Sequence, residues 1–393
     1  MNLQINTLLA IILGGGWLFS RLFSKIKMPP VLGMVIFGMI CSVTIRPYSD
    51  PVIYELEPYL KSFALIVILL RAGLGIHREV LKKVGKSALL MAFIPCLVEG
   101  TALIFTIRYF FGFSWEISGL TAFMLSAVSP AVVIPSMLDL KNRGHKEVPT
   151  IIMAGASADD VLAITLFSVF LGLSTNSETS AANAVLFVPI SLIVGIGSGI
   201  ITGLFLGAWF KHHHEKIRAT EKTLIILIFA TLLVETGNLL HFAALLGIMT
   251  CGFILLERHE KIANELANKL SHIWIIAEII LFVLIGFSLD ISVAYKAGLK
   301  GLIVISIGLL FRAAGVILAS SFSSLNYKER IFCAIAYMPK ATVQAALGGV
   351  ALANGIPSGS EILAIAVISI LFTAPAGLLG IRFFSKRLLK EPY

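Results

Sequence analysis

Two adjacent aspartates, Asp159 and Asp160, lie inside an apolar segment that runs from about residue 149 to 172. A segment of this length can cross the hydrocarbon core of a membrane as a helix. A charge at the centre of such a helix costs about 3 kcal/mol on insertion scales, so intramembrane carboxylates usually serve a function. Neighbouring residues are about 100° apart around a helix, so both carboxylates can face one cavity. Their oxygens suit hard cations. The pair therefore predicts a site for a cation or a proton in transit.

Three further charged residues are central in apolar segments: Glu99, Arg312 and Lys340. Arginine stays charged in essentially any protein site, so Arg312 needs an anion. We favour a structural pair with Glu99, and contact with Asp159 is the rival. Lys340 follows a mid-segment proline and is expected to neutralise the carbonyl end of a broken helix. The alternative is a snorkelling lysine beside a simple proline kink.

The elements that must position these residues are membrane spans. The 393-residue chain is 58% hydrophobic and 13% charged, with a mean hydropathy of +0.94, whereas soluble domains average about 25% charged residues. Apolar runs of about 17–25 residues mark spanning helices. They predict an all-α membrane protein with thirteen transmembrane helices, at 5–24, 29–45, 61–76, 87–111, 116–138, 149–172, 182–210, 223–240, 241–257, 270–290, 298–322, 329–353 and 360–384.

The basic residues orient these spans. Of the 31 lysines and arginines, 23 follow odd-numbered spans, and only 5, including Lys61 at the edge of the third span, fall on the other side. Basic loops stay in the cytoplasm, which predicts an outside N-terminus and a cytoplasmic C-terminus in the cell membrane, or the inner membrane of a bacterium. The net charge of +9 is then explained by the basic loops that set the topology. This distribution of the basic residues argues against a nucleic-acid partner. The four cysteines lie in apolar runs without paired spacing, which supports neither a disulfide framework nor a metal site.

The two halves of the chain resemble each other at an offset of about seven spans. Ser129-Pro130 lines up with Met338-Pro339, and Glu99 falls opposite Arg312. An odd number of spans places the two six-span halves in opposite orientations, as in the inverted repeats of secondary transporters. Pro130 and Pro339 lie mid-segment, where proline removes an N–H and clashes with the preceding turn. They predict a pair of broken helices at matching places in the two halves.

These motifs resemble the sodium/proton antiporters of the NhaA fold, in the cation/proton antiporter superfamily, and most closely the NHA branch. The resemblance rests on Ala158-Asp159-Asp160, on Ser129-Pro130, on Glu99 and Arg312, and on the run 339–346. It implies that Asp160 is the principal carboxylate for Na⁺ or Li⁺ and for the proton, with Asp159 as its partner. Ser129, Ser157 and Thr342 are the expected supporting ligands.

The resemblance also implies that the two broken helices cross in the core, a division of the chain into domains, and a homodimer. Residues 1–85 and 223–296 would form a dimerisation domain, 86–175 and 297–386 a mobile core domain, and 182–210 a linker helix. Many electrogenic members of the family carry a lysine at the position of Arg312, and that lysine can lose its proton. Arg312 cannot lose its proton. This departure favours electroneutral exchange.

The sequence therefore predicts a secondary active antiporter, not an enzyme, that exchanges Na⁺ or Li⁺ for H⁺ by alternating access and needs no cofactor. The alternatives within the fold are a K⁺/H⁺ antiporter and a sodium-coupled solute symporter. An intramembrane aspartyl protease would need two aspartates from separate helices that share a proton, and here the two are adjacent on one segment.

Overall fold

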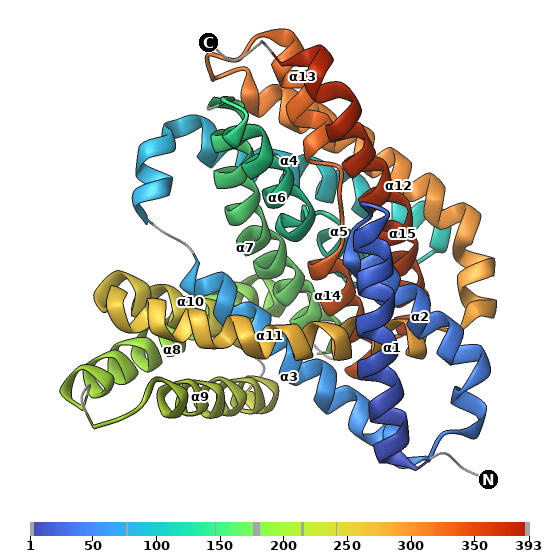
Figure 1. The fold of residues 1–393 in the computed structure, drawn as a ribbon, viewed down its shortest axis with the longest axis vertical. Coiled ribbons are helices and arrows are strands. Elements are labelled where there is room, and N and C mark those ends of the chain that lie inside the picture. Colours follow the sequence, from blue (N-terminus) through green and yellow to red (C-terminus); the bar gives the residue numbers. More distant parts are fainter. Residues whose placement is uncertain are drawn as a thin grey trace.

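The computed structural model describes residues 4–75, 78–145, 147–175, 181–213, 216–240 and 242–389. Within these ranges the chain forms fifteen α-helices and one short 3₁₀ helix, and no β-strand (Figure 1). The all-α prediction is confirmed for this part of the chain. Seven of the described helices are long and apolar enough to cross a membrane, which agrees with a multi-pass membrane protein.

One set of helices comes from the first and middle parts of the chain. α11 packs on α1, α2, α3, α9 and α10, and α10 packs on α3 and α8. The bounds of this set are α1 Ile5–Lys25, α2 Pro30–Thr44, η1 Arg46–Tyr48, α3 Val52–Leu74, α8 Ala181–His212, α9 Ala219–Leu240, α10 Ala244–Arg258 and α11 Glu260–Ser288.

The second set carries the charged residues singled out above. α4 packs on α12, α7 and α5, while α15 packs on α12, α13 and α14. Figure 1 shows α5, α6, α7 and α14 gathered in the middle of the view. The bounds are α4 Arg78–Phe111, α5 Trp115–Leu125, α6 Pro130–Asn142, α7 Glu147–Thr175, α12 Ile291–Ser320, α13 Tyr327–Ala336, α14 Thr342–Ala353 and α15 Gly359–Leu388.

Both predicted helix breaks are present. The predicted segment 116–138 forms α5 and α6, which are separated by residues 126–129, and the segment 329–353 forms α13 and α14, separated by residues 337–341. Pro130 is the first residue of α6, a position where its missing N–H costs nothing. Pro339 lies inside the second break, where it prevents α13 from continuing.

Several helices extend beyond the predicted apolar runs, which corrects those boundaries. α3 begins at Val52 instead of residue 61, so Lys61 is a buried residue in mid-helix and not an edge residue. The predicted loop 258–269 is mostly the first part of α11, which begins at Glu260. α4 likewise begins at Arg78. Hydropathy marks only the stretch that lipid would contact, whereas backbone hydrogen bonding continues through polar residues.

Glycines allow α4 and α12 to cross closely. A Cβ atom added at Gly315 of α12 would lie 2.8 Å from the Cα of Pro95 in α4. One added at Gly308 would lie 2.9 Å from Leu103 Cδ2 and 3.2 Å from Glu99 Oε1. Real Cβ atoms do not approach backbone carbon this closely, so the crossing requires glycine at position 315. It brings Glu99 of α4 against Arg312 of α12.

Candidate functional site

The two helix breaks contact each other directly. The backbone N–H of Ser129 donates to the carbonyl of Pro339 at 2.8 Å. Gln344, in the first turn of α14, joins them again, because its Nε2 donates to the carbonyl of Ala127 at 2.7 Å. Its Oε1 accepts from the N–H of Ala341 at 2.8 Å. A continuous helix would pair these backbone N–H and C=O groups internally. At the two breaks they are paired by contacts between the breaks and by the Gln344 side chain.

Asp159 is held against the first break. Its Oδ2 accepts from the backbone N–H of Val128 at 2.7 Å and from Arg312 Nη2 at 2.9 Å. The N–H of Val128 precedes the start of α6, where the helix dipole favours a negative charge. The side chain of Asp159 is fully buried. A carboxylate in this position stabilises the break and fixes Arg312 at the same time.

Arg312 connects the two breaks with α4. Its Nη1 donates to Glu99 Oε2 at 2.7 Å and to the carbonyl of Ser126. Its Nε donates to the carbonyl of Tyr337 at 2.8 Å. The predicted contact with Glu99 and the rival contact with Asp159 are therefore both present. Sequence reasoning treated them as exclusive, but the five N–H donors of a guanidinium can reach two carboxylates.

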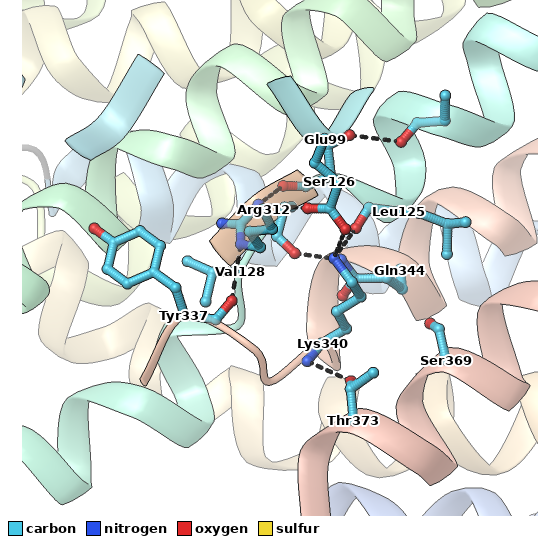
Figure 2. A network of polar contacts seen from close by, with 12 residues as sticks. Glu99, Leu125, Ser126, Val128, Arg312, Tyr337, Lys340, Gln344, Ser369 and Thr373 are labelled. Carbon is cyan, nitrogen blue, oxygen red and sulfur yellow. Dashed lines mark hydrogen bonds and ion pairs between the residues drawn. The ribbon is translucent and has the colours of Figure 1, made fainter. Parts of the chain in front are cut away.

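Lys340 closes the cluster from the second break (Figure 2). Its Nζ donates to the carbonyl of Leu125, the last residue of α5, and to Glu99 Oε1 at 2.6 Å. Lys340 therefore contacts the carbonyl end of α5, where charge compensation is expected, and it also forms an ion pair with Glu99. The backbone N–H of Lys340 donates to Thr373 Oγ1 at 2.9 Å. Lys340 is buried, so the snorkelling alternative is wrong.

The charges of this cluster balance without Asp160. Glu99 and Asp159 face Arg312 and Lys340, so two carboxylates meet two cations. Asp160 is 9% exposed and forms no ion pair within the described part of the chain. Its Oδ1 has no hydrogen-bond partner there, and neither do Asp159 Oδ1 and Ser129 Oγ. Buried polar atoms are nearly always paired, so these oxygens are the groups most available to a ligand.

Thr342 and Ser157 are the other two expected supporting ligands. Thr342 is buried and begins α14, directly after the second break. The side chain of Ser157 lies outside the described residues. Sequence reasoning did not include Gln344, Tyr337 and Thr373 in the site. Gln344 stood in the quoted run 339–346 and was a detectable signal, whereas no sequence pattern points from Thr373 to Lys340.

Two cavities approach the breaks from different directions. One, of about 340 Å³, lies between α3, α9 and α10 on one side and α7 and α14 on the other. Its lining includes Ser168, which follows Asp160 on α7, and Ala346, which follows Thr342 on α14. The second, of about 720 Å³, is lined by the turn between α1 and α2 and by Glu278 of α11. It is also lined by α6, from Val132 to its end, and by the last part of α15. Asp159 and Asp160 line neither cavity.

Residues 8–386 match the family model described as the transmembrane sodium/hydrogen exchanger. The chain belongs to the sodium/hydrogen exchanger family. This exchanger is 33% identical over 394 residues to sodium/hydrogen exchanger 9B2 of Mus musculus, with 95% of its own chain and 72% of that protein covered. It is also 33% identical over 382 residues to sodium/hydrogen exchanger 9B2 of Homo sapiens, with 93% and 70% covered.

A solved structure shares the fold of the exchanger. The sodium proton antiporter MjNhaP1 from Methanocaldococcus jannaschii aligns with a TM-score of 0.78 at 22% identity, covering 97% of each chain. The predicted membership of the cation/proton antiporters is confirmed, so the protein is a multi-pass membrane antiporter that exchanges cations and protons. The assignments to the NhaA fold and to the NHA branch stay predictions.

Proposed function

We propose that this exchanger moves Na⁺ or Li⁺ against H⁺ and that Asp160, with Asp159, is the group for which cation and proton compete. The observation that carries the proposal is the set of unpartnered carboxyl oxygens beside the helix breaks. Every other charge in the cluster is neutralised by a direct partner. A carboxylate that lacks a partner must take up either a proton or a cation when it is buried. That competition is the minimum chemistry of exchange.

The ligands of the cation are oxygen atoms in this proposal. Ser129 Oγ is buried and unpartnered next to the first break, and Thr342 and Ser157 would contribute from α14 and α7. Carboxylate, hydroxyl and carbonyl oxygens with water form the coordination shell of hard cations. The site is expected to hold no cofactor, and Na⁺ or Li⁺ is the cargo.

Arg312 sets the charge balance of the cycle. It remains protonated through the cycle because an arginine does not lose its proton in proteins. Its contact with Asp159 keeps a fixed positive charge beside one member of the pair. Only one carboxyl group, that of Asp160, is then free to exchange its proton. This arrangement favours electroneutral exchange of one cation for one proton.

The architecture we propose has thirteen spans in two inverted six-helix repeats, joined by α8. Two features support it. The breaks of α5–α6 and α13–α14 contact each other beside the prolines that the repeat aligns, through Ser129 and Pro339. Glu99 and Arg312 come from the helices that the repeat makes equivalent. Residues 1–85 and 223–296 would form the dimerisation domain of a homodimer. Residues 86–175 and 297–386 would form the core, and 182–210 the linker. The packing of the two helix sets is compatible with this division.

Alternating access would occur by movement of the core between two openings. One cavity is lined by the parts of α7 and α14 that lead away from the breaks, and the other by the part of α6 that leads away from its break. With the N-terminus outside, the first cavity opens to the outer face and the second to the cytoplasm. A shift of the core would connect Asp160 to one cavity at a time.

The ion is tested by reconstitution into proteoliposomes that carry an internal pH dye and an imposed pH gradient. NaCl or LiCl should dissipate the gradient, and KCl at the same concentration should not. The variant Asp160→Asn should be inactive, while Glu260→Gln, an exposed carboxylate at the start of α11, serves as the control. A response to KCl alone would make the protein a K⁺/H⁺ antiporter. A response only when an organic solute is present would indicate a symporter.

A further inference from the structure

A second cluster of buried charge lies away from the aspartates, in the set of helices that contains α3 and α11. Lys61 and Glu57, one turn apart on α3, are both buried and pair at 2.5 Å. Lys61 Nζ also donates to Ser288 Oγ at the end of α11 at 2.5 Å, and Ser288 Oγ donates to Glu57 Oε1. A single ammonium group is thus held by a carboxylate and a hydroxyl.

Lys61 also faces the route that an ion would take. It lines the 340 Å³ cavity, where Lys61 and Glu235 are the only charged residues among the described lining side chains. Its stem reaches the opposite wall, because a Cβ atom added at Gly349 of α14 would lie 3.7 Å from Lys61 Cδ. Glu57 does not line this cavity. Lys61 is therefore the member of the pair that lines the cavity, with its stem against α14 and its ammonium group turned to Glu57 and Ser288 at the edge of the cavity.

A purely structural role would be to join α3 to the end of α11. The carbonyls near that end already have other partners, since Arg46 donates to Phe287 at 3.1 Å and Ser42 donates to Leu289 at 3.0 Å. A buried ion pair also adds little net stability to such a contact, because the cost of removing two charges from water offsets most of their attraction. The position of the Lys61 stem, along the cavity and against α14, is not required for joining α3 to α11.

We propose that Lys61 tunes cation affinity in the outer pathway: its positive charge, offset by Glu57, sets the apparent affinity for the cation that enters through this cavity. The inference rests on the proposed exchange at Asp160. Ser168 lines the cavity eight residues beyond Asp160 on the same helix, which is about 12 Å along the axis. In the proposed cycle the ion site would be nearer to this charge when it opens to this cavity than when it opens to the other one.

The two partners should therefore act in opposite directions. Lys61→Gln leaves the carboxylate of Glu57 unbalanced, which attracts cations into the cavity and should lower the KM for Na⁺ added from the outer face. Glu57→Gln leaves the ammonium unbalanced and should raise that KM. Each shift should be about threefold, as expected for one unit charge acting over about 10 Å in a partly hydrated space. The double variant should return to the wild-type value.

The experiment measures Na⁺-driven proton exchange in oriented proteoliposomes, with Na⁺ added on each face in turn. We expect opposite KM shifts on the outer face only, with kcat changed less than KM, and smaller shifts when choline chloride raises the ionic strength. A structural role would lower activity and melting temperature in both single variants without a change of sign. Lys222→Gln is the control, since Lys222 is also a buried lysine that pairs with a glutamate, Glu265, at 3.4 Å, and it lines neither of the two cavities.

Shifts of the same sign in both single variants, or an equal shift in Lys222→Gln, would overturn the role of Lys61. Unchanged KM values in a protein that Asp160→Asn inactivates would overturn it while leaving the proposed function intact. A wild-type protein that exchanges neither Na⁺ nor Li⁺ would overturn both. If Lys61→Gln does not fold, Glu57→Gln and the double variant still give the sign of the effect.

Discussion

Four buried side chains, Glu99, Asp159, Arg312 and Lys340, depend on one another for their charge balance. Glu99 contacts both cations, and Arg312 contacts both carboxylates. A buried charge that loses its partner is far more costly than a pair that is replaced as a unit. The cluster should therefore respond to single substitutions in a strongly non-additive way.

Glu99→Ala tests this dependence. It leaves Arg312 with one carboxylate and Lys340 with none, and it should cost roughly 3–5 kcal/mol of stability. Arg312→Ala should cost a similar amount, and the double variant should lose less than the sum. Thermal unfolding of the four proteins in detergent gives the cycle. Additive losses would show that the two residues do not interact. Transport by Glu99→Gln should be weakened and not abolished, because Asp159 and Asp160 remain.

Gln344 has a separate role, since it carries no charge and pairs backbone groups of both breaks. Gln344→Leu leaves the N–H of Ala341 and the carbonyl of Ala127 without this partner. Each unsatisfied group costs about 1–3 kcal/mol, so the melting temperature should fall. Gln344→Glu keeps the side-chain oxygen that accepts from the N–H of Ala341, so its melting temperature should fall less than that of Gln344→Leu. A melting temperature unchanged in Gln344→Leu would contradict the assigned contacts.

The close crossing of α4 and α12 determines whether Glu99 and Arg312 meet. Gly315→Ala adds a carbon 2.8 Å from Pro95, so the helices must separate. We expect a lower melting temperature and slower exchange. Gly298→Ala, in the same helix, adds a carbon with nothing within 4 Å, and it should raise stability by up to about 1 kcal/mol because alanine favours a helix. Equal effects of the two substitutions would refute the crossing as the cause.

Sequence predicts the elements better than their ends. Apolar runs and mid-segment prolines located the helices and both breaks, because burial in lipid and the missing proline N–H are local properties. The burial of Lys61 was missed, since the run of apolar residues starts after it and its partner Ser288 is 227 residues away. The double contact of Arg312 was missed for the same reason. Long-range geometry decides such contacts, and no local pattern carries it.

The whole molecule is oriented by its basic residues, and labelling can test that orientation. All four native cysteines are buried, so a cysteine introduced at the surface can be labelled selectively. A cysteine at position 177, which lies outside the described residues, should react with an impermeant thiol reagent from the outer face. One at His213 should react only from the cytoplasm, since basic loops stay inside. The reverse pattern would contradict both the topology and the inverted repeat.

The central claim is that Na⁺ and H⁺ compete for Asp160, and proton release on cation binding tests it most directly. Purified protein in weakly buffered detergent solution, near the pH at which exchange is half-maximal, receives NaCl while a pH dye reports free protons. We predict that the wild-type protein releases protons on addition of NaCl and that Asp160→Asn, shown to be folded by its melting curve, releases none. Equal proton release by Asp160→Asn would contradict the assignment of this carboxylate as the exchange site.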